Sequence, residues 1–153
     1  MKLFYSPFHS FIHKILVTAH EGDLWQDITF VPCFPFKNRE GEDQGDAYSI
    51  ASLNPLDKVP TLALDDGQVI YGSQAVAECL DNMSQSGRHL YPASGSKRWE
   101  AVTRLALADT IFETTVQLAM EGWQPIEQQR IDFFKWIWPK IIRGCDSLEV
   151  SCK

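Results

Sequence analysis

Apolar residues recur at helical spacing in several parts of the chain. Between residues 9 and 20 they fall three or four positions apart, at Phe11, Ile12, Ile15, Leu16 and Ala19. Residues 97–121 and 126–148 show the same period over longer stretches. Because a repeat of about 3.6 residues places apolar side chains on one helix face, we expect three amphipathic helices here. Pro139 lies inside the last one and should kink it unless the helix breaks there.

Short apolar runs bounded by turn residues indicate strands. They cover residues 2–5, 25–32, 61–64 and 69–71, and another helix is expected over 73–83. A short helix is expected over about 46–53, after a polar loop at 34–45. This order of elements is typical of a small mixed four-stranded sheet with helices on both faces. We therefore predict an α/β N-terminal domain followed by an all-α region.

The boundary between these regions is marked by a change in pattern. Gly87 and Pro92 interrupt the helical period, and only long helical stretches follow them. We predict a first domain at 1–83, a linker at 84–96 and a partial helical domain of two long helices at 97–153.

Composition and charge narrow the choice of partners. The 153 residues are 44% apolar and 22% charged, with a formal net charge of −6. An acidic balance argues against nucleic acid as a main partner. No apolar run approaches the ~18 residues of a membrane span, and no long apolar segment of a signal peptide follows Met1. We expect a cytoplasmic protein without a membrane partner.

The four cysteines do not form a metal-binding pattern. They stand at positions 33, 79, 145 and 152, without a C-x-x-C pair or the spacing of a zinc site. We expect reduced thiols and no metal.

A proline before the third strand and a serine after the fourth indicate a ligand site. Val59-Pro60 precedes the run that begins at Thr61, and a proline there removes one backbone donor. The X-Pro bond at such a position can be cis. Gly72-Ser73 opens the next helix, whose free N–H groups favour negative charge. Together these features predict a place that holds a peptide-like anion.

The residues around this proline resemble those of the glutathione S-transferase family. The segment 54–62 reads NPLDKVPTL, where the family has N-P-x-x-K/R-V-P-x-L with a cis proline; D-G and then Y-G-S-Q-A-V follow it. The resemblance covers almost the whole chain. It implies a thioredoxin-like N-terminal domain and the first two helices of the family's helical domain.

The resemblance also implies how glutathione is held as co-substrate. The backbone of Val59, between Lys58 and Pro60, would pair with the cysteinyl part of the tripeptide like an added strand. Ser73 and the helix N–H groups near Gln74 would receive the γ-glutamyl carboxylate. Many relatives carry Glu or Asp directly before this serine for the γ-glutamyl amine, whereas this chain has Gly72. Both Ser73 as a ligand contact and Ser73 as a plain helix cap fit this sequence.

The group that would activate the glutathione sulfur is open among three candidates. Bacterial relatives often read S-P-x-S-P-F/Y-x-R-K at the first turn, and this chain reads SPFHSFIHK from residue 6. No cysteine is present there, so thiol exchange is not expected. We rank Ser10 first as the hydroxyl at the helix start, His9 second as an N–H donor and Ser6 third. A helix cap at Ser10 and an exposed turn residue at His9 are the alternatives without catalysis.

Two functions and one assembly follow from the resemblance. The chain is expected either to conjugate glutathione to a small hydrophobic electrophile, or to be a transferase-like binding or interaction module with weak or no activity. Family members continue with further helices where this chain ends at Lys153. Two amphipathic helices would leave apolar residues such as Trp136, Trp138 and Ile142 uncovered. We expect a homodimer that covers them, the alternative being a fragment or a naturally short product.

Overall fold

The first unit of the structure is built on a four-stranded mixed sheet. The computed structural model describes residues 1–33 and 50–151 and divides into two compact units, Met1–Tyr91 and Pro92–Lys153. The strands β1 (Lys2–Tyr5), β2 (Thr29–Pro32), β3 (Thr61–Ala63) and β4 (Val69–Tyr71) form the order β2-β1-β3-β4. β1 runs parallel to β2 and antiparallel to β3, which is antiparallel to β4. The predicted class, an α/β domain with a mixed four-stranded sheet followed by a helical region, is confirmed.

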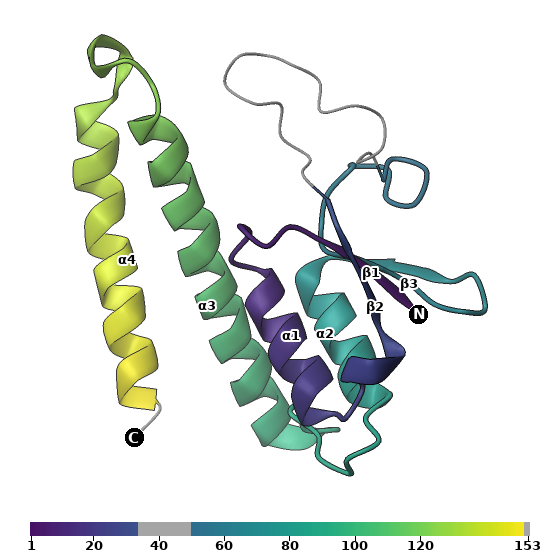
Figure 1. Ribbon diagram of the computed structural model, residues 1–153. Helices are drawn as coiled ribbons and strands as arrows, with labels where there is room; N and C mark the ends of the chain where they lie inside the picture. The colour runs from purple at the N-terminus through teal and green to yellow at the C-terminus, as the bar shows by residue number, and fades with distance from the viewer. Residues whose placement is uncertain (34–49, 152–153) are drawn as a thin grey trace. The chain divides into compact units, whose positions relative to one another are not determined.

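Two helices pack side by side in this unit (Figure 1). They are α1 (Ile12–Glu21) and α2 (Ser73–Asn82). Their apolar residues share one fully buried cluster with Leu3 of β1 and Leu62 of β3. Alternate residues of the strands, Phe4 and Val31, pack in a second cluster with Cys33, Ile50 and Val59. The period of two along each strand thus supplies a core on both sides of the sheet.

The residues after α2 stay bound to the first unit. The buried Asp81 carboxylate accepts hydrogen bonds from the backbone N–H groups of Leu90, at 2.5 Å, and Tyr91, at 3.2 Å. The Ser86 hydroxyl donates to the Glu21 carbonyl at 2.6 Å. Much of the segment that we interpreted as a linker is therefore fixed to α1 and α2.

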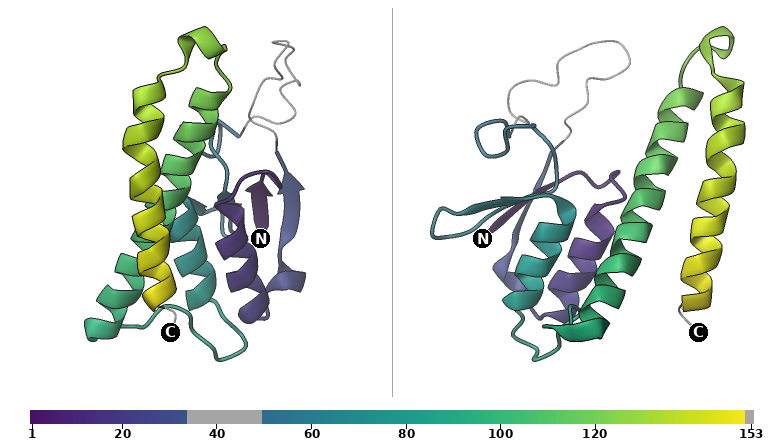
Figure 2. Two further views of the ribbon diagram at one scale, coloured as in Figure 1. Left: turned by 90° about the vertical axis from the view of Figure 1, so that its left-hand side faces the viewer. Right: turned by 180° about the vertical axis from the view of Figure 1, so that it is seen from behind.

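The second unit is an antiparallel helix pair (Figure 2). It consists of α3 (Gly95–Gly122) and α4 (Ile131–Ser151), joined through a short turn η3 (Ile126–Gln128). Leu118, Ile137 and Ile141 form its core. The helices approach closely at Gly144, where an added Cβ would lie 2.8 Å from Cδ1 of Ile111. No helix of the described residues has the length and apolar character needed to cross a membrane.

Two predicted boundaries differ from the structure. Residues 25–27 form a turn, η1 (Trp25–Asp27), and not the start of a strand, because the Asp27 N–H donates to the Leu24 carbonyl at 3.0 Å. The last helix begins at Ile131 and not near Ile126, since the Glu121 carboxylate binds the backbone N–H of Arg130. It does not break at Pro139. Half of the short helix predicted at 46–53 lies outside the described residues, and 51–53 form a turn. The loop predicted at 34–45 lies wholly outside the described residues.

The start of α1 also differs from the prediction. We expected the helix to begin near His9 or Ser10, but its first residue is Ile12 and Phe11 holds the cap position without a side-chain hydrogen bond. His9 and Ser10 lie in a preceding turn, where their carbonyls accept hydrogen bonds from Ile12 and His13. Ser10 is therefore not a helix cap.

Candidate functional site

Three chain segments that carry the predicted site residues meet at one end of the sheet. In the strand register Phe4 of β1 lies opposite Thr61, and Thr61 lies opposite Tyr71 of β4. Because both pairings are antiparallel, the residues after β1, before β3 and after β4 come out at the same edge. Residues 6–10, 58–60 and 72–74 thus gather there, and we call them the strand-end site. It belongs entirely to the first unit.

The Val59-Pro60 peptide bond is cis and both residues are buried. The Val59 side chain packs with Cys33 and Ile50, and this buried contact holds its backbone in place. Neither the N–H nor the C=O of Val59 is hydrogen-bonded to another residue of the described ranges. A backbone with both groups unused is the type that an extended peptide pairs with.

The segment before Pro60 is held by buried polar side chains. Asn54, only 3% exposed, donates through Nδ2 to the Lys58 carbonyl at 2.7 Å, and its Oδ1 accepts from the Leu56 N–H at 3.1 Å. Thr61, fully buried, donates through Oγ1 to the same Lys58 carbonyl at 2.9 Å. Our sequence interpretation did not select Asn54 and Thr61, although a polar residue at the head of the apolar run 61–64 was a signal.

The start of α2 forms a pocket of about 410 Å³. Its lining is Gly72, Ser73, Gln74, Ala75 and Glu78. Gly72 occupies the cap position with φ +89°, and Ser73 is the first helical residue, so Ser73 is not the helix cap. The first backbone N–H groups of a helix have no partner within it and attract anions. The positive φ explains glycine at 72, because an acidic residue there would be strained.

The three candidates for sulfur activation have different environments. Ser6 is 4% exposed at the end of β1, whereas Ser10 and His9 are half-buried. Burial, and next to it the positive charge of Lys58, lowers the pKa of His9 below its ordinary 6.5. The imidazole is therefore neutral at neutral pH and carries one N–H donor. Nδ1 is buried without a hydrogen-bond partner in the described part of the chain.

The cysteines and the possible metal ligands of the described residues show which chemical groups are present at this site. Cys33, Cys79 and Cys145 are free thiols in the structure, and Cys152 lies outside the described residues. Burial raises the pKa of the Cys33 thiol, so it is protonated at neutral pH. Among the described residues no group of His, Cys, Asp and Glu is arranged to hold a metal ion. The groups available here are backbone donors, hydroxyls, a neutral imidazole and the exposed Lys58 ammonium.

A comparison with models of known protein families shows which family has this fold and sequence pattern. The family model described as "Glutathione S-transferase, N-terminal domain" matches residues 8–83, which include most of the strand-end site. The chain belongs to the glutathione S-transferase family. Its thioredoxin-like first domain is the part that carries the family's sequence pattern.

Members of the family with similar sequences and structures span a longer chain. The uncharacterized GST-like protein YibF of Escherichia coli K12 is 28% identical over 149 residues, which are 97% of this chain and 68% of that protein. A family member from Pseudomonas fluorescens Pf-5, solved with bound glutathione, has a TM-score of 0.80 and 28% identity over 97% of this chain and 70% of its own. A glutathione S-transferase of Methylobacillus flagellatus KT, solved with GSH bound, has a TM-score of 0.81 and 28% identity, covering 96% and 67%.

Proposed function

We propose that the chain binds glutathione at the strand-end site and conjugates it to a small hydrophobic electrophile. The observation that supports this most is the backbone of Val59, whose N–H and C=O have no hydrogen-bond partner among the described residues. It would pair with the cysteinyl part of glutathione, with Lys58 and Pro60 on either side. Two solved relatives that are 28% identical hold glutathione, which agrees with this ligand.

The pocket at the start of α2 would take the other end of the tripeptide. Ser73 and the N–H groups near Gln74 would bind the γ-glutamyl carboxylate, supported by the partial positive charge of the helix N-terminus. Gly72 provides no carboxylate for the γ-glutamyl amine, and the Gln74 side-chain amide would supply a neutral contact in its place.

The conjugation needs a thiolate. The glutathione thiol would release its proton to solvent, and a donor in the turn 6–10 would stabilise the sulfur anion. The sulfur would then attack the electrophilic carbon, so that a C–S bond forms and the leaving group departs with its electron pair. Ser10 remains the first candidate for this donor because its hydroxyl is half-buried and not used as a helix cap. His9, as a neutral N–H donor, comes next, and the buried Ser6 third.

A second candidate function is a binding module without turnover. Gly72 in place of an acid and His9 in place of the family's usual serine or cysteine favour it. Such a module would use the same strand-end site for glutathione and would lack an effective group for the sulfur.

We also propose a homodimer formed through the second unit. Large apolar side chains are exposed on both of its helices, among them Met120 on α3 at 52% and Trp136 and Trp138 on α4 at 60% and 58%. Apolar surface of this size on a helix pair favours association. The cytoplasmic location expected from the sequence stays a prediction.

Binding and turnover can be separated with two assays. The chain should be retained on resin that carries glutathione and be released by free glutathione, and it should conjugate glutathione to 1-chloro-2,4-dinitrobenzene. Ser10→Ala should lower turnover by about tenfold or more without loss of retention, and His9→Ala and Ser6→Ala test the other two donors under the same conditions. Retention with no turnover above that of the Ser10→Ala control would support the module. No retention would refute glutathione binding.

A further inference from the structure

Asn54 and Thr61 bind one carbonyl from two directions. The Lys58 C=O accepts from Asn54 Nδ2 at 2.7 Å and from Thr61 Oγ1 at 2.9 Å. Asn54 Nδ2 also donates to Thr61 Oγ1 at 3.2 Å, so the three groups form a closed triangle. A carbonyl oxygen has two lone pairs, and both are used here. The two side chains are 3% and 0% exposed, which protects these bonds from competition by water.

This triangle fixes the direction of the next N–H group. Among the described residues only the Val59–Pro60 bond is cis, and the Lys58–Val59 peptide is trans. In a planar trans peptide the C=O and N–H point in opposite directions. With the Lys58 carbonyl held inward by Asn54 and Thr61, the Val59 N–H must point away from them. That N–H has no hydrogen-bond partner in the described part of the chain.

The position of Thr61 is also fixed, by the pairing of its backbone within the sheet. It is the first residue of β3 and pairs with Phe4 on one neighbour and Tyr71 on the other. Its hydroxyl therefore holds the Lys58 carbonyl in a fixed position relative to the sheet. Asn54 is tied in turn by its backbone, whose N–H donates to the Ile50 carbonyl at 2.8 Å and whose carbonyl accepts from the Asp57 N–H at 2.8 Å. The peptide before Val59 is thus held by a rigid frame.

We propose that Asn54 and Thr61 are positioning residues, which hold the Val59 N–H in the direction needed to pair with a peptide ligand. The inference rests on the proposed binding of glutathione at the strand-end site. Neither side chain has to touch the ligand, because both act through the Lys58–Val59 peptide. Their loss frees this peptide to rotate, and the ligand must then restore its orientation at the expense of affinity.

The test compares two buried threonines. Thr61→Val keeps the side-chain shape and removes the hydroxyl, while Thr61→Ser keeps the hydroxyl. Thr18→Val is the matched control, because Thr18 is 3% exposed and its hydroxyl donates to the Lys14 carbonyl at 2.8 Å within α1. Glutathione binding is measured by calorimetry and stability by urea unfolding on the full chain.

Thr61→Val should raise the glutathione Kd by about tenfold or more, while Thr61→Ser and Thr18→Val stay within about twofold of the wild type. The residual dipolar coupling of the Val59 N–H, measured without ligand, should change in Thr61→Val and not in Thr18→Val. A purely structural role would lower stability in both valine variants and leave the Kd and this coupling unchanged. Asn54→Ala gives the same comparison if Thr61→Val does not fold.

The outcomes distinguish this inference from the proposed function. If the wild type binds glutathione and Thr61→Val and Asn54→Ala bind it equally well, the positioning role is wrong and the binding site stands. If the wild type does not bind glutathione, the proposed function is wrong and the positioning role with it.

Discussion

His9 shows how the environment of one side chain decides what it can do. Its imidazole is half-buried, and the nearby Lys58 ammonium disfavours a second positive charge. Burial makes the larger contribution to the lowered pKa. A protonated imidazole would attract the glutathione thiolate through its charge, whereas the neutral form offers only a hydrogen bond. At neutral pH His9 can therefore offer a ligand a neutral N–H donor and no positive charge.

The lowered pKa of His9 makes stability depend on pH. The unfolded chain binds a proton near pH 6.5 and the folded chain only at lower pH, so His9 favours folding above pH 6.5. This contribution is lost as the pH falls through the folded-state pKa. His9→Asn should therefore reduce the loss of stability below pH 6.5 in urea unfolding. The exposed His13, changed to Asn, is the control and should keep the wild-type profile; an unchanged profile in His9→Asn would contradict the assignment.

At the residue scale, the sequence indicated which segments form the candidate site, but not which side chains act in it. The segments 58–60 and 72–74 could be found because proline, glycine and serine have strong backbone preferences. The cap at Phe11 and the roles of Asn54 and Thr61 could not, because they depend on contacts set by the fold. The pattern at residues 6–14 places a hydroxyl near a helix start but does not decide at which residue that helix begins.

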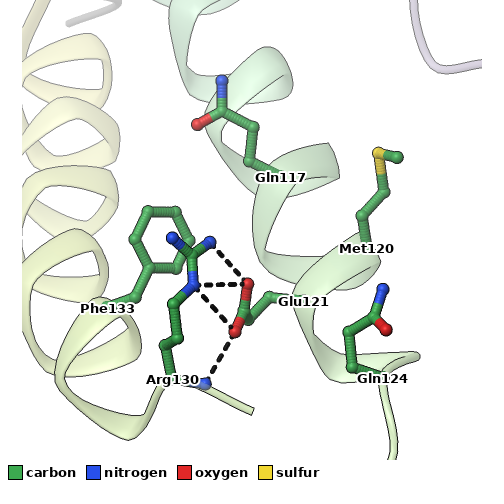
Figure 3. Close-up of a pocket in the computed structure, with 6 residues that line it drawn as sticks. All are labelled: Gln117, Met120, Glu121, Gln124, Arg130 and Phe133. Carbon is green, nitrogen blue, oxygen red and sulfur yellow. Dashed lines mark hydrogen bonds and ion pairs between the residues drawn. The ribbon is translucent and has the colours of Figure 1, made fainter. Parts of the chain in front are cut away.

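At the scale of elements, the turn between α3 and α4 is closed by one ion pair (Figure 3). Glu121, only 8% exposed, accepts from the Arg130 backbone N–H at 2.6 Å and from Arg130 Nη2 at 2.6 Å. The guanidinium also lies 4.8 Å from the centre of the Phe133 ring. These residues line a pocket of about 300 Å³ together with Gln117, Met120 and Gln124. Glu121 and Arg130 are nine residues apart in sequence, and no local pattern predicts a contact between them. We therefore placed the start of α4 too early.

This ion pair should make the second unit sensitive to acid. The hydrogen bonds from the Arg130 side chain, and then from its backbone, lower the pKa of Glu121 below its ordinary 4.5. The carboxylate thus stabilises the fold above pH 4.5, and this contribution is lost as the pH falls through the folded-state pKa. Glu121→Gln should remove this part of the pH dependence.

Tryptophan fluorescence is a suitable measurement, since four of the five tryptophans lie in the second unit. Glu100→Gln is the control, because Glu100 forms an exposed pair with Arg104 one turn along the same α3 helix. Such exposed pairs contribute little. Equal pH profiles for the two variants would rule out a special role of Glu121.

The close approach of α3 and α4 at Gly144 predicts a packing defect. A Cβ at this position would lie 2.9 Å from Cγ1 of Ile111, whereas one at Gly122 would meet nothing within 4 Å. Gly144→Leu should lower the free energy of unfolding by about 1–3 kcal/mol relative to Gly122→Leu, because leucine suits helices and the cost comes from overpacking. Urea unfolding of both variants measures the difference, and equal stabilities would show that the helices separate without cost.

At the scale of the whole molecule, the pattern of apolar positions was enough to predict the order of the main elements. The short apolar runs at 2–5, 61–64 and 69–71 correspond to β1, β3 and β4, and the long stretches of helical period correspond to α3 and α4. This pattern does not predict which apolar side chains stay exposed once each unit has packed. Leu118, Ile137 and Ile141 fill the seam of the helix pair, with Ile111, Phe133 and Phe134 packed against them. Large apolar residues such as Met120, Trp136 and Trp138 remain exposed.

Charge complementarity supports a second copy of the chain as the cover of this surface. Between residues 105 and 120 α3 carries Asp109 and Glu113 and no Lys or Arg, whereas between 131 and 143 α4 carries Lys135, Lys140 and Arg143 against Asp132. An isologous pairing would bring the acidic part of one copy to the basic part of the other. Glu113→Lys and Lys140→Glu should each weaken the dimer, and the double variant should restore it. Sedimentation equilibrium measures the dissociation constant, which should rise with salt. A monodisperse monomer at all concentrations would exclude the dimer, and a double variant as weak as the single ones would place the contact elsewhere.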